Sequence, residues 1–473
     1  MKTKFLTLLL MSGLTMMLAG CNKNDANGSY VNVSDNSCSF NYSGGTATIM
    51  VSASEAWRTE TTANWIEVTE NSNYIIVTAA ENDGKVERTC EINVIAGSAS
   101  SVITIYQQGN SEMPVIYRKC PTSIFSHNGE YVCGIYSSIE NSANVIYLVL
   151  LECKTGRELV YGPYNRDTFP VTGVVAVTDT GDIFMCSGEG GSGGATYFFN
   201  RKDLSISFFD EGTVYGCNAD GSVVTGHRRA DYLIDDFVPY IPYKWVNGVA
   251  QELPKPETPL RYSNNWYGGV IGRGLSTDGK IIFGTEWQGT DFFMIWWDED
   301  GNWHRVGDDV SETFTIPVTD KNGEYAGDYI GVKGMINVNC YYAISPSGKW
   351  ISGWYYETVI KEDGSISSVL YPAFYNTEQG KTYIFWDYPD GKAICAREDG
   401  IGFIKTNADI FQTDVQMSNF FTVDIENETV ISTTQQWFFD NYGIYPPVKA
   451  VTIGFSDDYK IAMFQNAYLV DRR

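Results

Sequence analysis

The chain has 473 residues and a formal net charge of −24, and 14% of its residues are aromatic. Aromatic residues favour strands and the 46 glycines favour turns, which argues against a helical bundle or coiled coil, while 43% hydrophobic residues can bury a large core and exclude disorder. Nucleic acid is excluded as a partner, because a protein that binds it needs a cationic surface to release counterions.

Residues 1–20 have the pattern of an export signal. Lys2 and Lys4 precede an apolar run, 5–18, that is long enough for a signal sequence and short for a membrane span. The run leads into Leu18-Ala19-Gly20-Cys21, which resembles the lipobox of bacterial lipoproteins. The resemblance implies that residues 1–20 are removed and that Cys21 is lipidated. An ordinary cleaved signal with a chance cysteine is the alternative.

Residues 21–29 are expected to form a polar tether that starts at the lipidated Cys21. Lipid chains on Cys21, rather than a basic patch, would hold so acidic a protein to the membrane. We expect a lipid-anchored protein of the outer membrane that is exposed at the cell surface. The periplasmic face remains the alternative, because the tether has only one acidic residue, Asp25, beside Lys23.

Residues 30–109 predict a small immunoglobulin-like β-sandwich. Short strand-like runs are separated by turn signals: Ala47–Val51, Trp65–Val68, Tyr74–Val77, Cys90–Val94 and Val102–Ile105.

The same stretch resembles the BACON domain of Bacteroidetes proteins. The resemblance rests on Ser39-Phe40, Gly44-Gly45-Thr46, Trp57, Asn64-Trp65-Ile66, the stretch from Glu81-Asn82 to Arg88, and the ending Ile105-Tyr106-Gln107-Gln108-Gly109. It implies association with carbohydrate, and a spacer role is equally consistent. Trp57 and Trp65 could stack on sugars, but their alternation with polar neighbours favours core packing.

Residues 112–473 contain seven copies of one pattern, a polar turn followed by an apolar strand. The turn glycine or its equivalent stands at Gly129, Gly181, Gly221, Gly279, Gly348, Gly400 and Tyr459, with a mean interval of about 55 residues. This predicts a β-propeller of no named subtype with four strands per blade. Seven blades are favoured, with six or eight as alternatives. Val115–Tyr117 would complete the last blade, and two unrelated β-sandwiches are the competing interpretation.

One group of residues suggests a ligand site on the propeller. In each copy the loop after the repeated strand should reach the same face, and there the sequence places Tyr136, Arg228, Glu286, Trp287, Trp354, Tyr355 and Glu357. Aromatic rings beside charged groups suit sugar rings, whose C–H faces stack and whose hydroxyls need polar partners. The alternative is that these aromatic residues pack between blades.

Cofactor and metal sites are not expected. The three histidines are isolated, no HExxH or CxxC motif occurs, and Cys21 leaves an odd number of other cysteines, nine of ten. These cysteines are expected to be small buried hydrophobic residues.

Three functions follow from these observations. The first is glycan capture, as on mucin or polysaccharide, without catalysis. The second is a glycan-active hydrolase or lyase with acidic residues at the propeller mouth, an analogy of fold alone. The third is a scaffold that holds protein partners in an outer-membrane complex.

Overall fold

The computed structural model describes residues 29–471, and Cys21 and the expected signal lie outside it. Within that range it leaves out 83–86, 110–114, 118–123, 141–142, 168, 189–193, 235–236, 258–266, 289–290, 320–323, 338–342, 362–363, 407–414, 417–418, 448, 451 and 465–466. The regular secondary structure of the described chain consists of strands and one helix, α1 (Thr434–Tyr442), and no described helix is long and apolar enough to cross a membrane.

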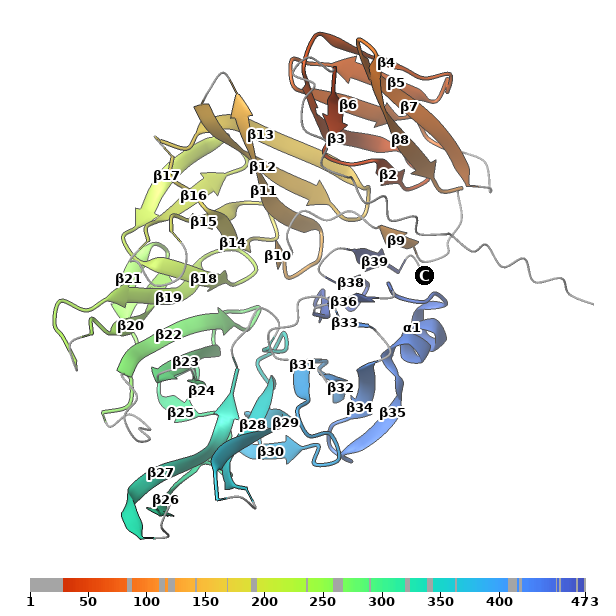
Figure 1. Ribbon diagram of the computed structural model, residues 1–473. Coiled ribbons are helices and arrows are strands. Elements are labelled where there is room, and N and C mark those ends of the chain that lie inside the picture. Colours follow the sequence, from red (N-terminus) through yellow and green to blue (C-terminus); the bar gives the residue numbers. More distant parts are fainter. Residues whose placement is uncertain are drawn as a thin grey trace, which may run out of the picture.

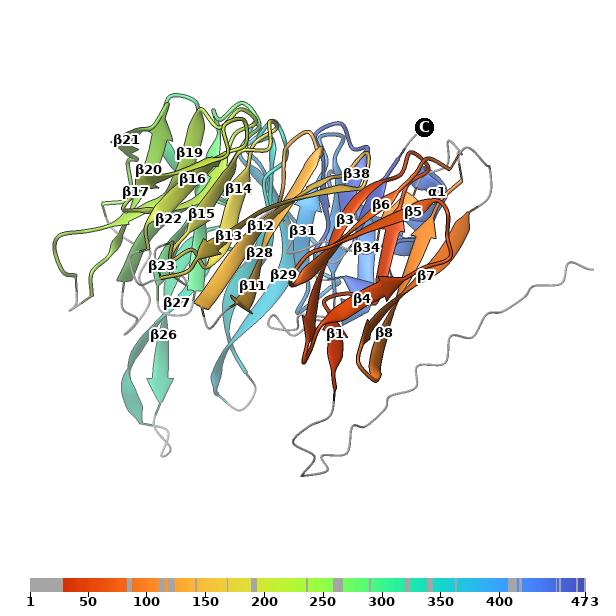
Figure 2. The same cartoon turned by 90° about the horizontal axis from the view of Figure 1, so that it is seen from above.

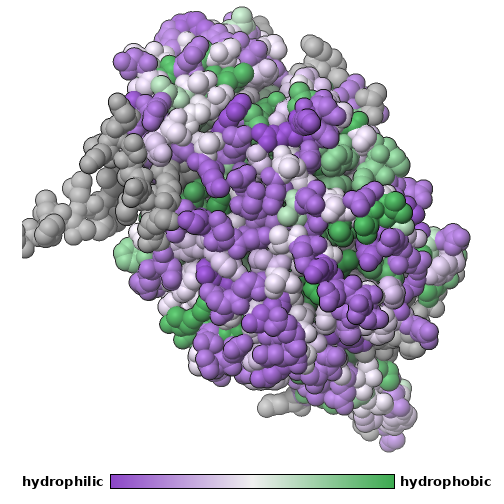
Figure 3. Space-filling model, turned by 180° about the vertical axis from the view of Figure 1, so that it is seen from behind, coloured by the Kyte–Doolittle hydropathy of each residue, from purple (hydrophilic) through white to green (hydrophobic). Residues whose placement is uncertain are grey.

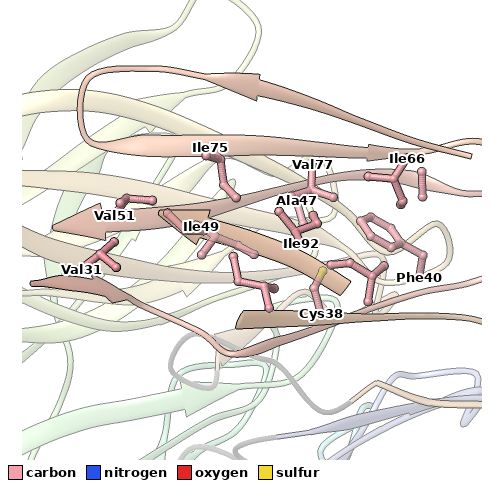
Figure 4. Close-up of a cluster of buried hydrophobic side chains, with 14 of the residues drawn as sticks. Val31, Cys38, Phe40, Ala47, Ile49, Val51, Ile66, Ile75, Val77 and Ile92 are labelled. Atoms are coloured by element: carbon pink, nitrogen blue, oxygen red, sulfur yellow. The ribbon is translucent and has the colours of Figure 1, made fainter. Parts of the chain in front are cut away.

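Two four-stranded sheets form the expected sandwich. One has the order β1 (Val31–Val33), β3 (Gly45–Ala53), β6 (Tyr74–Ala79), β5 (Ile66–Glu70), and the other β2 (Ser37–Phe40), β8 (Ala99–Gln107), β7 (Arg88–Ala96), β4 (Trp57–Glu60). Alternate side chains of both sheets, such as Ile49, Val77 and Ile92, are fully buried and meet between them (Figure 4).

Seven strand units surround a common axis (Figure 1). The first three are β10–β13 (Ile124–Phe125, Tyr131–Glu140, Ala143–Glu152, Arg157–Asn165), β14–β17 (Gly173–Val177, Ile183–Cys186, Thr196–Asn200, Ser205–Asp210) and β18–β21 (Thr213–Cys217, Val223–Arg229, Tyr240–Val246, Val249–Glu252). The fourth and fifth are β22–β25 (Tyr267–Leu275, Ile282–Gln288, Asp291–Trp297, Trp303–Arg305) and β28–β30 (Trp350–Ile360, Ile366–Asn376, Lys381–Ile384). The sixth is β31, β32, β34 and β35 (Lys392–Ala396, Ile401–Lys405, Phe420–Asp424, Thr429–Thr433), and the seventh is β37–β39 (Gly454–Phe455, Ile461–Met463, Tyr468–Val470) with β9 (Val115–Tyr117). We number these blades 1 to 7. The predicted propeller with seven blades is confirmed.

Two further pairs of strands lie outside this pattern. A hairpin of β26 (Glu312–Thr319) and β27 (Tyr325–Ile336) joins blade 4 to blade 5, and it projects beyond the disc (Figure 2). It occupies the longest interval between turn glycines, from Gly279 to Gly348. The short strands β33 (Val415–Gln416) and β36 (Lys449–Ala450) pair with each other.

The ring closes as expected, through β9. Val115–Tyr117 pairs antiparallel with Tyr468–Val470, so the N-terminal strand of the repeat region supplies the outer strand of blade 7. The predicted strands 460–463 and 467–470 are confirmed as β38 and β39. The predicted innermost strand at 450–453 is wrong. The inner strand is Gly454–Phe455, because the turn begins at Ser456, just as Ile124–Phe125 directly precedes the turn at Ser126 in blade 1.

The seven repeated turns form a belt of hydrogen bonds around the axis. Apart from the Tyr459 hydroxyl, the bonding groups lie in or next to the residue two before each turn glycine or its equivalent. The bonds run Asp457 N to His127 O (2.8 Å), Asn128 N to Asp179 Oδ1 (2.9 Å), Asp179 N to Ala219 O (2.7 Å), Ala219 N to Thr277 O (3.1 Å), Thr277 N to Pro346 O (2.8 Å), Ser347 N to Glu398 Oε1 (2.7 Å) and Glu398 N to the Tyr459 hydroxyl (2.7 Å). Each blade is therefore tied to the next, and the belt closes between blades 7 and 1.

The sandwich lies against the rim of the propeller at blade 1 (Figures 1 and 2). Asn41 Nδ2 donates to Lys154 O at 2.7 Å, and a cavity of about 200 Å³ separates β3 and β6 from β12 and β13. The domain limits 30–109 and 112–473 stay predictions, which the truncations described in the Discussion test.

Candidate functional site

A cavity of about 120 Å³ on the propeller axis is lined by residues from all seven blades, which come from inner strands or the turns after them except in blade 5, where the segment 344–346 before β28 takes that place. At the end of the cavity where the repeated turns lie, the side chain of His127 reaches across the axis. Its Nε2 lies 3.0 Å from Cys217 O and its Nδ1 3.2 Å from Thr277 Oγ1, and the Thr277 hydroxyl donates to Asp457 Oδ2 at 2.7 Å. Burial is the largest single influence on the pKa of His127 and lowers it, but the hydrogen bond to Asp457 and its charge, the bond to Cys217 O and the charge of Asp179 together raise that pKa above its ordinary value. His127 thus joins four blades and narrows this end.

A line of rings in contact lies between blades 3 and 4, and we call it the aromatic row: Tyr215, His227, Tyr240, Trp287 and Phe292. Neighbouring rings are stacked except His227 and Tyr240, which meet edge to face at 66°. Successive ring centroids are 5.6, 4.3, 5.5 and 5.4 Å apart, and the Tyr240 and Trp287 rings are almost parallel, at 3°. His227 and Tyr240 are buried, whereas Tyr215, Trp287 and Phe292 are half-buried. The row therefore has a protected centre and partly accessible rings at both ends.

Strand register assembles this row. Arg229 stands directly opposite Tyr240 in the β19–β20 pair, so both project on the same face as His227. The next blade approaches through Gly269, which pairs with Tyr240 and has φ of +93°. A Cβ atom at Gly269 would lie 2.2 Å from the Tyr240 carbonyl oxygen, so only glycine allows this approach.

Two guanidinium groups accompany the row. Arg229 is exposed, and its guanidinium carbon lies 5.9 Å from the Tyr240 ring centroid. Arg273 comes from the inner strand β22, lines the axial cavity, and lies 4.8 Å from the Tyr215 centroid and 5.7 Å from that of Phe292. Its Nε donates to Thr285 Oγ1 at 3.2 Å.

His227 stays neutral at physiological pH. Its side chain is 2% exposed, and its Nδ1 has no hydrogen-bond partner among the described residues. Burial, with the nearby charges of Arg273 and Arg229, lowers the pKa of His227 to about 3. The site thus combines a neutral imidazole with two cations.

Three of the predicted site residues are buried. Glu286 is fully buried and accepts from Arg305 Nη1 at 2.9 Å, and Trp354 and Tyr355 are only 3% and 5% exposed. The expectation that these three side chains are available to a ligand is therefore wrong. Packing within the propeller covers all three side chains. For the two aromatic residues, such packing was the alternative interpretation.

The other four are half-buried, and only Trp287 belongs to the aromatic row. Arg228 projects on the opposite face from Arg229 and binds both oxygens of Asp210, at 3.0 and 2.5 Å. Glu357 pairs with Lys333 at 3.2 Å, and Tyr136 lies within β11. Their role in ligand binding stays a prediction.

The position of the seven residues also needs correction. We expected them in loops, but all lie within strands: β11, β19 and β23, the second strands of blades 1, 3 and 4, or β28, the first strand of blade 5. Sequence reasoning missed Arg229, Arg273 and Tyr240. Two signals could have found the arginines. Arg229 follows Arg228 in a strand, so their side chains project on opposite faces, and Arg273 is the one charged residue in the otherwise apolar, glycine-rich run 267–275.

The two tryptophans of the sandwich favour the packing interpretation. Trp57 and Trp65 are partly buried against the core between the sheets. The Arg88 guanidinium carbon lies 4.4 Å from the Trp65 ring centroid, so a cation already occupies one face of that ring. Among the described residues, no group of three metal-ligating side chains gathers at one place.

Fold and site together define a small β-sandwich joined to a seven-bladed β-propeller with an aromatic and cationic cluster between two blades. Residues 55–108 match the model of the BACON family, "Putative binding domain, N-terminal". No curated protein matches the chain.

Three solved structures illustrate what the chain resembles. A protein from Bacteroides thetaiotaomicron solved by NMR is 16% identical and covers 20% of this chain and 99% of its own, with a TM-score of 0.17. TolB from Acinetobacter baumannii is 11% identical over 74% of this chain and 76% of its own, with a TM-score of 0.31. A quinonprotein alcohol dehydrogenase-like protein from Bacteroides thetaiotaomicron is 10% identical over 84% and 93%, with a TM-score of 0.30. Likenesses this low say nothing of function.

Proposed function

We propose that this protein is a lipid-anchored outer-membrane protein that captures carbohydrate without acting on it chemically. The observation that carries the proposal is the match of the sandwich to the BACON binding domain. The aromatic row between blades 3 and 4 supports it, because half-buried aromatic rings beside charged groups suit the apolar faces and hydroxyls of sugars.

The two carboxylates that were candidates for catalysis are both engaged in ion pairs, which favours capture over a hydrolase or lyase activity. Glu286 is buried in an ion pair with Arg305, and Glu357 pairs with Lys333. Both carboxylates are therefore engaged in ion pairs within the fold, Glu286 with its own blade and Glu357 with the hairpin strand β27. Hydrophilic residues dominate the face seen from behind, where hydrophobic residues are scattered in small groups (Figure 3), so that face gives the scaffold hypothesis no support.

Retention of the protein on immobilised polysaccharides tests the proposal. We expect retention on at least one host, plant or microbial glycan and no new reducing ends or unsaturated products in the eluate. Absence of retention on the whole panel would contradict glycan capture. If products do form, Glu286→Gln and Glu357→Gln should each be assayed, and activity retained in both would remove these two residues from the mechanism.

The membrane anchor has its own test. We expect an alkyne fatty acid supplied to growing cells to label the wild-type protein, and Cys21→Ser to lose both the label and its sedimentation with membranes. Cys90→Ser, which changes a half-buried sandwich thiol, is the matched control and should keep the label. Protease treatment of intact cells then separates surface exposure, which we expect, from the periplasmic face.

A further inference from the structure

Arg273 has hydrogen-bonding capacity that the described residues do not use. A guanidinium group carries five N–H donors, and here one of them, on Nε, bonds to Thr285 Oγ1. No described carboxylate forms an ion pair with Arg273 or with Arg229. Arg228, the neighbour of Arg229 in the chain, shows the contrast, because Asp210 accepts from it twice.

The surroundings of Arg273 make this capacity significant. Its side chain is half-buried on the wall of the axial cavity, between the rings of Tyr215 and Phe292. A partly buried cation loses hydration, and aromatic faces compensate only a part of that loss. His227 lies beside it with a buried Nδ1 that has no hydrogen-bond partner among the described residues. The place is therefore rich in positive charge and poor in acceptors.

We infer that Arg229 and Arg273 bind the carboxylate or sulfate group of an acidic sugar unit, with the half-buried Trp287 and Phe292 beside the sugar ring. The planar fork of a guanidinium matches both anions, and the rings offer apolar surface to the C–H faces of the sugar. The inference rests on the proposed carbohydrate binding and adds the chemical class of the ligand. Since a protein of charge −24 repels anions at a distance, such a site needs local cations.

The chain has only three histidines, so His227 can report on this site directly by NMR with labelled imidazoles. Glucuronate and inorganic sulfate are the two probes, and glucose is the neutral control. We expect an anion to shift the His227 signals and to raise its pKa, because bound negative charge offsets the two arginines. The signals are assigned through their loss in His227→Phe.

Substitutions locate the response. Arg273→Gln and Arg229→Gln should each weaken anion binding on the order of tenfold or more, because each removes a charge-assisted contact. Arg166→Gln is the matched control, since Arg166 in blade 1 also lacks an ion pair with any described carboxylate, and it should bind like wild type. A response to glucuronate alone identifies a uronate, and one to sulfate alone identifies a sulfated sugar. No response to either, or equal binding by all three variants, overturns the inference.

The same variants on polysaccharide columns separate this inference from the proposed function. We expect acidic polysaccharides to retain the wild type and to lose Arg273→Gln, while their carboxyl-reduced or desulfated forms retain neither. Retention on neutral glycans with a silent His227 would leave glycan capture standing and overturn the acidic site. A responsive His227 without retention on any glycan would leave the anion site standing and overturn glycan capture.

Discussion

Deletion of residues 114–119 is expected to lower the melting temperature on the order of 10 °C or more and to reduce solubility, because it removes β9. This strand forms the outer edge of blade 7 through its pairing with Tyr468–Val470. Without it β39 becomes an exposed edge, which can pair with another chain and aggregate. The belt of turn hydrogen bonds would still close the inner side of the ring, so we expect a weakened rather than an unfolded propeller.

Deletion of residues 30–109 is the matched comparison and should be tolerated far better. The sandwich has its own core between two sheets, and few polar contacts join its described residues to blade 1, such as Asn41 with Lys154. Calorimetry of both truncated proteins gives the answer. If loss of 114–119 is silent while loss of 30–109 unfolds the rest, then closure does not depend on β9 and the predicted domain limit is wrong.

Acidification from pH 7 to pH 5 is expected to cost about 2 kcal/mol of folding stability through His227 alone. The pKa of His227 is about 3 in the folded protein, well below the ordinary value of 6.5. Between these two values the unfolded chain binds a proton that the folded protein does not bind. The contribution of His227 is therefore full above about pH 6.5 and is lost as the pH falls towards 3.

Denaturant unfolding of wild type and His227→Phe at several pH values measures this effect. Phenylalanine keeps an aromatic ring in the row but cannot titrate. Between pH 7 and pH 5, His227→Phe should therefore lose about 2 kcal/mol less folding stability than the wild type. His127 provides the opposite case, since its pKa is raised, so its contribution is present in acid and is lost as the pH rises through that pKa. Parallel curves for wild type and His227→Phe would show that His227 titrates normally.

The sequence was sufficient to predict the sandwich and the seven blades because both depend on local signals. Each blade repeats a turn that is closed by hydrogen bonds between residues close in sequence. The N–H of the turn glycine or its equivalent bonds to the carbonyl oxygen of the residue at the Ser126 position, as Gly279 N does to Ser276 O. Strand alternation likewise marked the core of the sandwich, for example at Ile92 and Val94.

The site could be predicted only in part, because it depends on contacts between blades. Trp354 and Trp287 occupy similar places in their strands, yet the first is buried and the second half-buried, and neighbours distant in the sequence decide the difference. The guanidinium of Arg273 meets Tyr215 across a blade boundary, and no spacing in the sequence encodes that meeting. The hairpin β26–β27 was visible only as a long interval.

The belt of turn hydrogen bonds also bears on how the seven repeats could drift apart. Where its bonds join backbone groups, the side chain is free to change, and the seven equivalent positions hold His127, Asp179, Ala219, Thr277, Pro346, Glu398 and Asp457. Even proline is tolerated, because Pro346 accepts through its carbonyl and the next residue, Ser347, donates in its place. At the four bonds that join backbone groups alone, the ring thus gains its continuity without a rule on residue identity, which leaves these positions open to acquire individual roles such as the crossing of the axis by His127. The other three bonds depend on the side chains of Asp179, Glu398 and Tyr459.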